Sequence, residues 1–113
     1  MIFTNLKKSS NFKINYDFGK KTWFGTGGNS FIFIKVNTIN KLIFFLKVLP
    51  KKIPIFILGA GSNIIIRDGG YKGIVLKLGR DFSQIKVNKS NSRILVGSAV
   101  KDSELAKFCQ NNN

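Results

Sequence analysis

The sequence of 113 residues contains no histidine, and this absence excludes several kinds of active site at once. Ser-His-Asp and Cys-His catalysis, histidine acid–base chemistry and most zinc centres need an imidazole that the chain does not have. Acidic residues are also few: Asp17, Asp68, Asp81, Asp102 and Glu104. Only the last two are close in sequence, and carboxylates are expected there because a helix starts near them. The sequence therefore predicts neither a carboxylate pair for acid–base catalysis nor a metal site.

Cysteine and long apolar runs are scarce as well. The single cysteine, Cys109, cannot form an internal disulfide, which fits a reducing compartment. We expect it to be a small, half-buried thiol rather than a reactive one. The longest apolar stretch, residues 42–49, is interrupted by Lys47 and is too short to span a membrane. The first eight residues lack the apolar stretch of a secretion signal, so we expect a cytoplasmic protein with no membrane partner.

Negative charge is scarce relative to positive charge, and the formal net charge is +14. One interpretation is a nucleic-acid or acidic-membrane partner. The other is codon bias, because Lys, Asn, Ile and Phe dominate the chain and all four have AT-rich codons. Sixteen lysines outnumber three arginines and are scattered along the sequence, whereas base contacts and bidentate phosphate contacts favour arginine. We favour codon bias and expect no specific nucleic acid as a partner, although loose polyanion binding at low salt is compatible with it.

A strand–helix–strand pattern occupies the middle of the chain. Residues 30–36 are aromatic and β-branched, which predicts a strand covered on both faces. Thr38 is a suitable N-cap for a helix that runs to about Leu49, before Pro50. Residues 53–58 then form a second apolar run, which predicts a buried strand. This βαβ order predicts that the two strands are parallel, with a right-handed crossover.

The loop Gly59-Ala60-Gly61-Ser62-Asn63 follows the second strand directly. Glycines let the backbone turn sharply and approach a ligand closely, and consecutive N–H groups in such a turn can bind an anion. A phosphate or pyrophosphate is the natural ligand, although many such loops are tight turns that bind nothing. The loop is not a dinucleotide-binding Rossmann fingerprint, because residues 64–66 are three isoleucines that disfavour the helix this fingerprint needs.

The remaining segments complete an α/β (α+β) fold. A turn at Asp68-Gly69-Gly70 precedes a strand over residues 73–78, and residues 82–87 and 93–99 predict an antiparallel hairpin. A last, short helix starts near Asp102. We expect residues 1–20 to be a loosely ordered N-terminal arm with at most a short helix or turn.

Two glycine motifs carry a resemblance to a known family. Residues 58–63 and the isoleucine stretch, turn and strand after them resemble the flavin-binding loop of UDP-N-acetylenolpyruvoylglucosamine reductases, also called UDP-N-acetylmuramate dehydrogenases. Residues 21–29, Lys-Thr-Trp-Phe-Gly-Thr-Gly-Gly-Asn, resemble the family's Thr-x-x-x-x-Gly-Gly motif, with Thr26 at a position more often held by a larger apolar residue. The resemblance implies an FAD-binding domain of the PCMH/vanillyl-alcohol-oxidase type over residues 21–113. It implies that this domain is incomplete, with a small βαβ subdomain and the start of a second, mainly antiparallel one.

The resemblance also implies a cofactor and a reaction. It assigns the FAD pyrophosphate to Gly59, Ala60, Gly61, Ser62 and Asn63. In the family NADPH reduces the bound FAD, which passes a hydride to the enolpyruvyl group of a UDP-sugar. The motifs for that chemistry lie beyond Asn113, so no catalytic residue is assigned, and the UDP-sugar is expected to bind only with the missing C-terminal part, which could be a separate fragment. The alternatives are an inactive remnant of a split or truncated reductase gene and a small basic nucleic-acid-binding module.

Overall fold

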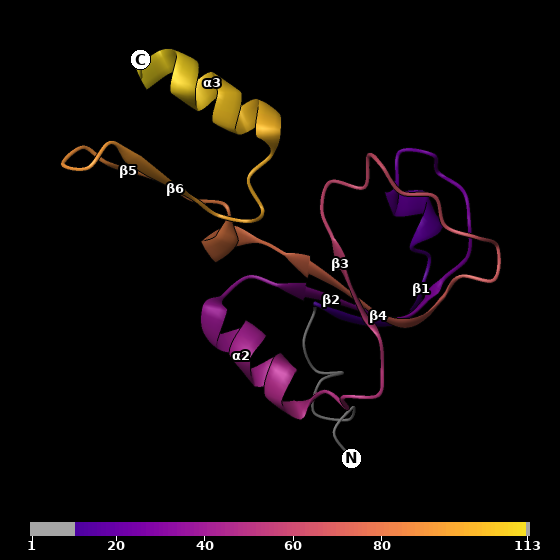
Figure 1. The fold of residues 1–113 in the computed structure, drawn as a ribbon. Coiled ribbons are helices and arrows are strands. Elements are labelled where there is room, and N and C mark those ends of the chain that lie inside the picture. The colour runs from indigo at the N-terminus through magenta and orange to yellow at the C-terminus, as the bar shows by residue number, and fades with distance from the viewer. Residues whose placement is uncertain (1–10, 113) are drawn as a thin grey trace.

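The computed structural model describes residues 11–112, and its main body is a four-stranded sheet. The strand order is β1-β2-β4-β3, and the strands are β1 (Phe12–Tyr16), β2 (Ser30–Val36), β3 (Ile55–Leu58) and β4 (Tyr71–Leu78). β2, β3 and β4 are parallel, and β1 is antiparallel to β2. Helix α2 (Ile39–Val48) lies against one face of this sheet, and the loops that follow β1 and β3 lie on the other side (Figure 1).

The elements of the predicted strand–helix–strand unit are confirmed. The Thr38 side chain accepts a hydrogen bond from the Lys41 backbone N–H at 3.3 Å, as an N-cap does. The helix ends at Val48, with Leu49 extended before Pro50, because a residue that precedes proline disfavours the helical region. The second strand of this unit is shorter than predicted, since β3 begins after Pro54.

The predicted burial of the second strand needs a correction. β2 and β3 are parallel but are not neighbours, because β4 pairs with both of them and lies between them. The central strand is the most buried one: Ile74, Val75 and Leu76 are fully buried, whereas Ile57 of β3 is 57% exposed. β3 is therefore an edge strand rather than a buried one, which suits a segment that begins next to a proline.

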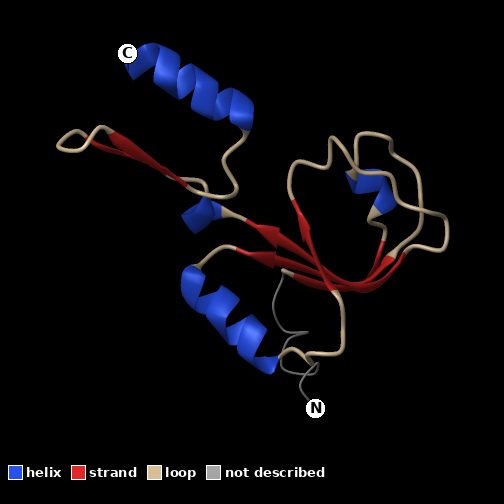
Figure 2. Cartoon of the chain, viewed as in Figure 1, coloured by secondary structure: helices blue, strands red, loops and turns tan. Residues whose placement is uncertain are grey.

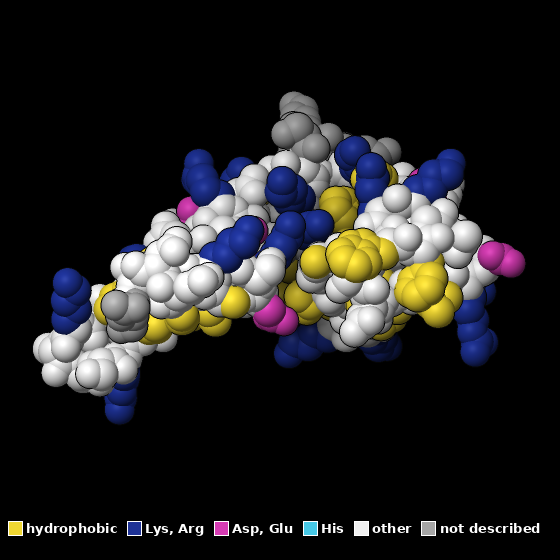
Figure 3. All heavy atoms as spheres, turned by 90° about the horizontal axis from the view of Figure 1, so that it is seen from above, with side chains coloured by type: hydrophobic (Ala, Val, Ile, Leu, Met, Phe, Trp, Pro, Cys, Tyr) yellow, Lys and Arg dark blue, Asp and Glu magenta, His cyan; other side chains and the backbone are white. Residues whose placement is uncertain are grey.

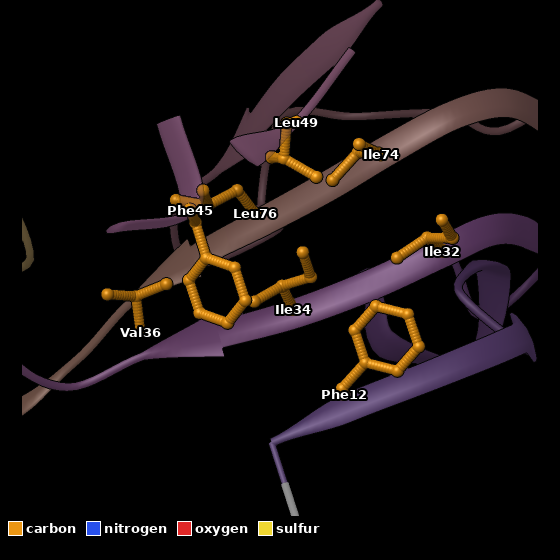
Figure 4. Close-up of a cluster of buried hydrophobic side chains, with 8 residues drawn as sticks. All are labelled: Phe12, Ile32, Ile34, Val36, Phe45, Leu49, Ile74 and Leu76. Atoms are coloured by element: carbon orange, nitrogen blue, oxygen red, sulfur yellow. The ribbon is translucent and has the colours of Figure 1, made fainter. Parts of the chain in front are cut away.

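Two hydrophobic clusters lie on the two faces of this sheet. The larger cluster lies under α2, where Phe45 points toward Ile34 and Val36 of β2 (Figure 4). Alternation along each strand sends the other side chains to the opposite face. There, Phe33 of β2, Val75 of β4 and Leu58 of β3 pack with Phe18. The sheet is thus apolar on both faces, as the sequence of residues 30–36 predicts.

Residues 11–20 do not match the expected loosely ordered arm. Residues 12–16 form the edge strand β1, and residues 19–21 form a short 3-10 helix, η1. Phe12 and Phe18 are 8% and 1% exposed, so burial of these aromatic rings fixes the segment to the sheet. The part of the expected arm over residues 1–10 lies outside the described residues.

The last third of the described chain forms a separate unit beside the sheet (Figure 2). It contains a 3-10 helix η2 (Arg80–Phe82), a two-stranded antiparallel sheet of β5 (Ile85–Asn88) and β6 (Arg93–Val96), and helix α3 (Asp102–Asn112). The hairpin is confirmed, and β5 and β6 are shorter than the predicted strands. Backbone pairing continues beyond them, because the Gly97 and Ala99 N–H groups donate to the Gln84 and Phe82 carbonyls at 2.8 Å. No side chain of α3 is buried, and Cys109 is exposed rather than half-buried. Among residues 11–112, no helix combines the length and apolar composition that crossing a bilayer requires.

Candidate functional site

The glycine loop of residues 59–63 leaves the sheet at the carboxyl end of β3. Because β2, β3 and β4 are parallel, their carboxyl ends lie at the same edge, which is the usual ligand edge of such sheets. Leu58, the last residue of β3, is buried and anchors the start of the loop. The chain after the loop, residues 64–67, has no regular secondary structure, so it does not form the helix that the three isoleucines disfavour.

Gly61 is the residue that fixes the loop to the rest of the domain. Its φ angle is +78°, a left-handed conformation that favours glycine. Its carbonyl accepts a hydrogen bond from the Trp23 N–H at 2.9 Å, and a Cβ at this position would lie 3.0 Å from the Lys21 carbonyl oxygen. Gly61 therefore allows the backbone of the loop to pack directly on the segment that follows η1.

The second glycine motif packs against the chain that follows the loop. The Gly28 N–H donates to the Arg67 carbonyl at 3.0 Å, and the Tyr71 N–H donates to the Asn29 carbonyl at 2.9 Å. A Cβ on Gly27 would collide with the carbonyl oxygen of Ile66. Residues 27–29 and 66–71 are thus in direct backbone contact, which explains why the motif has glycine at positions 27 and 28.

A cavity of about 450 Å³ opens beside the loop. Three of the five predicted site residues, Gly59, Ala60 and Ser62, line it. Gly61 is buried behind it, and Asn63 is exposed and does not contribute to the lining. Within residues 11–112, no N–H group of residues 59–63 donates a hydrogen bond to the backbone of another loop or turn. These donors, with the Ser62 hydroxyl, remain available to an anion.

Sequence reasoning missed several residues of this cavity. Its remaining lining comes from the segment after η1, from the ends of β3 and β4, and from the unit that contains α3. These residues are Trp23, Ile57, Leu58, Lys77, Leu78, Ser98, Ala99, Val100, Lys101, Asp102 and Ser103. Lys77 is half-buried on β4 and supplies positive charge close to the loop. The alternation of residues 73–78 predicts the face on which Lys77 lies. No sequence signal shows that residues 98–103 return to the glycine loop.

Lys101, Asp102 and Ser103, at the start of α3, line the cavity, and the Glu104 and Leu105 N–H groups donate to the Lys101 carbonyl. Asp102 and Glu104 already interact favourably with that end of the helix dipole. The carboxylates would repel a second anion at this point, so Lys77 and the loop N–H groups are the better anion donors. Among the described residues, no group of three or more His, Cys, Asp or Glu side chains could hold a metal ion.

Comparison with known proteins places this arrangement in a family. Residues 32–113 match the family described as FAD binding domain. The chain belongs to this family. FAD is the cofactor that the family implies, and the FAD-binding domain has a mixed α/β fold, as the sequence predicts.

The FAD-binding domain also matches curated reductases. It is similar to the UDP-N-acetylenolpyruvoylglucosamine reductase of Rickettsia canadensis (strain McKiel), with 46% identity over 101 residues. The reductases of that name from Rickettsia rickettsii (strain Sheila Smith) and Rickettsia typhi (strain Wilmington) are also 46% identical over 101 residues. Each match covers 89% of this chain and 34% of the relative, so the chain spans about a third of the length of the curated relatives it matches. These matches confirm the resemblance indicated by the two glycine motifs.

The residues of the loop cavity fit a dinucleotide pyrophosphate. A Cβ built on Gly59 meets no atom within 4 Å, so the backbone is open to the cavity at that position. An incoming phosphate would meet unpaired N–H donors, the Ser62 hydroxyl and the ammonium group of Lys77. The assignment of FAD to these atoms stays a prediction, because it rests on their chemistry and on the family.

Proposed function

We propose that this FAD-binding domain is the N-terminal part of a UDP-N-acetylenolpyruvoylglucosamine reductase and holds the FAD pyrophosphate on Gly59, Ala60 and Ser62. The observation that carries the proposal is the row of unpaired N–H groups at the carboxyl edge of a parallel sheet, beside an open cavity. Lys77 would neutralise part of the pyrophosphate charge, and Gly61 would hold the loop in shape from behind. Asn63, which lies off the cavity, would act only by supporting the loop.

The chemistry proposed for the whole enzyme is a reduction that uses NADPH. Bound FAD supplies hydride transfer, which none of the described side chains can supply. The role of this chain is to bind and orient that cofactor, while the UDP-sugar and the groups that protonate the product would be contributed by sequence outside it. A domain of the PCMH/vanillyl-alcohol-oxidase type, with its cofactor between two subdomains, agrees with a cavity lined by both the main sheet and the unit of α3.

We also propose that the remaining two-thirds of such a reductase, as a continuation or a separate fragment, covers the β5–β6 hairpin. A two-stranded sheet is marginal alone, and Val87, Ile94 and Leu95 are 45%, 43% and 69% exposed. Co-expression with the corresponding C-terminal segment of the Rickettsia canadensis reductase should give one complex on gel filtration, and separate elution would contradict this interface.

The experiment that tests the cofactor proposal is a titration of the purified chain with FAD, followed by visible absorption of the protein-bound flavin. Gly59→Val places a side chain in the cavity, and Gly69→Val is a matched control because a Cβ at Gly69 also meets no atom within 4 Å. We expect Gly59→Val to weaken FAD binding at least tenfold and Gly69→Val to leave it unchanged, with both variants folded by circular dichroism. Equal affinity in the two variants would contradict the site. No binding by the parent chain would favour the inactive-remnant alternative.

A further inference from the structure

Four lysines that are far apart in the sequence line a second cavity. Lys13 comes from β1, Lys21 from the end of η1, Lys35 from β2 and Lys77 from β4. This lysine cavity has a volume of about 320 Å³, and its other lining residues are Asn11, Tyr16, Phe33 and Leu58. The fold therefore gathers positive charge that is scattered along the chain.

Strand register explains why these lysines share a face. Lys13 is opposite Phe33 in the pairing of β1 with β2, and Lys35 is opposite Lys77 in the pairing of β2 with β4. Since side chains alternate along a strand, these residues lie on the face opposite α2. On that face, Figure 3 shows Lys and Arg side chains gathered near the middle of the molecule.

The lysine cavity has no internal counter-charge. Like charges on directly opposed strand positions repel each other, as Lys35 and Lys77 do. The described carboxylates that form ion pairs are Asp17, with Lys20 at 3.0 Å, and Asp81, with Arg80 at 3.4 Å. Within residues 11–112, no carboxylate lines the cavity or pairs with its four lysines. A bound anion would remove this repulsion.

Aromatic rings form part of the cavity wall beside Lys13. The Lys13 ammonium lies 4.7 Å from the centre of the Tyr16 ring, and the Tyr16 and Phe33 rings are 4.6 Å apart. Phe33 and Leu58 are buried at the floor, and Lys77 is half-buried. Lys77 is thus partly screened from water, which strengthens its attraction for an anion, whereas Lys13, Lys21 and Lys35 are exposed and add positive charge without that gain.

We propose that the lysine cavity is an anion site for a ligand that carries a phosphate or pyrophosphate group. Each phosphate monoester carries about −1.5 to −2 charges, so the negative charge of a pyrophosphate group can balance several lysines at once. A single carboxylate carries too little charge to do this. Lysine binds phosphate as a point charge and does not need the planar fork of arginine. The site shares Leu58 and Lys77 with the loop cavity but otherwise has its own residues.

The test is a calorimetric titration of the full chain with inorganic pyrophosphate and with ADP, at about 150 mM NaCl so that weak surface attraction is screened. The double variant Lys13→Gln, Lys35→Gln removes two charges that line only this cavity. The control, Lys86→Gln with Lys107→Gln, removes the same charge from the exposed surfaces of β5 and α3. We expect at least a tenfold loss of affinity in the first variant and less than a twofold change in the second. Equal losses in the two variants, or no loss in the first, would overturn the proposal.

Further titrations separate this site from the loop cavity and identify the source of the phosphate. Pyrophosphate affinity should persist in Gly59→Val, and its loss there would place the anion in the loop cavity and overturn the lysine site. If ADP competes with FAD and the Lys13, Lys35 variant weakens both, the lysine site holds one end of the cofactor. If FAD binding is unaffected, the ligand is a separate nucleotide. The pyrophosphate titration gives its answer even if the chain binds no FAD.

Discussion

Gly59 and Gly61 lie two residues apart in one loop, yet they need to be glycine for different reasons. Gly61 is buried, has a positive φ angle and packs against the Lys21 carbonyl, so it determines the shape of the loop. Gly59 has free space around it and borders the cavity, so a side chain there would restrict only what enters. The sequence shows two identical residues, and only the structure distinguishes a supporting role from a binding role.

This difference predicts opposite effects of the two glycines on stability. Gly61→Val should lower the free energy of unfolding by about 2 kcal/mol or more, because a β-branched residue is strained at positive φ. Gly59→Ala should change it by less than about 0.5 kcal/mol, as expected for an exposed position. Urea unfolding followed by circular dichroism measures both. A Gly61→Val variant as stable as the parent would show that the loop tolerates another backbone conformation.

Ser30 gives a second prediction at the level of a single residue. Its side chain is fully buried at the start of β2, and its hydroxyl oxygen has no hydrogen-bond partner among the described residues. A buried hydroxyl without a partner costs about 1–3 kcal/mol, so Ser30→Ala should leave stability unchanged or raise it. The measurement is the urea midpoint at constant m-value. A loss of more than about 1 kcal/mol would mean that the hydroxyl bonds to a group not seen here.

At the level of elements, α2 is held to the sheet by few side chains. Phe45 and Leu49 are 5% and 6% exposed, whereas the neighbouring Phe44 is 52% exposed. The helix therefore depends on a narrow apolar stripe, although its sequence is apolar on most sides.

The adjacent phenylalanines provide a matched test of this stripe. Phe45→Ala should lower the free energy of unfolding by about 3–5 kcal/mol, because it leaves a cavity between α2 and β2. Phe44→Ala makes the same chemical change on the exposed side and should cost less than about 1 kcal/mol. Thermal and urea unfolding of both variants give the comparison. Similar losses would mean that Phe44 is buried by contacts outside the described residues.

Elements were predictable from the sequence where local patterns decide them. Thr38 and Pro50 locate the two ends of α2, and the isoleucines at 64–66 disfavour a helix after the glycine loop. The strand order was not predictable, because the insertion of β4 between β2 and β3 depends on pairings distant in sequence. β1 carries only a weak signal, because Phe12 and Ile14 alternate with Lys13, but Asn15 has a positive φ angle and Tyr16 packs with the cluster on the opposite face from Phe12.

The candidate site was predictable only in part for a similar reason. The glycine loop is contiguous and can be identified by motif. Lys77, Trp23 and residues 98–103 reach the cavity from three other segments, so their place depends on the tertiary fold. The lysine cavity could not be predicted from the sequence, because its four lysines come from four separate elements and are scattered along the chain.

The whole molecule has one well-buried part and one exposed part. Both hydrophobic clusters belong to the four-stranded sheet and the segments packed on it, and among the described residues only Phe82 of the later unit packs against them. Because the later unit lies beside the sheet, the molecule is elongated, with extents of 48 × 32 × 24 Å. Its stability should therefore differ between the two parts.

Hydrogen exchange should reveal this division directly. Amides of β2 and β4 should exchange only through global unfolding, whereas those of β5, β6 and α3 should exchange through local opening, at least a hundredfold faster. Mass spectrometry of exchanged peptides measures both sets under native conditions. Uniform protection across the two parts would contradict the division and indicate that α3 packs on the sheet more tightly than its exposure suggests.

Trp23 has one more consequence for the study of this protein. It is the only tryptophan in the sequence, it is 79% exposed, and it lines the loop cavity. Its fluorescence therefore reports on a single location without any label, and a flavin bound beside it would quench that emission by energy transfer. Inorganic pyrophosphate in the lysine cavity would not quench it by this route, because the anion does not absorb tryptophan emission and Trp23 does not line that cavity. The protein thus carries a built-in optical probe that distinguishes a bound flavin from a bound inorganic anion.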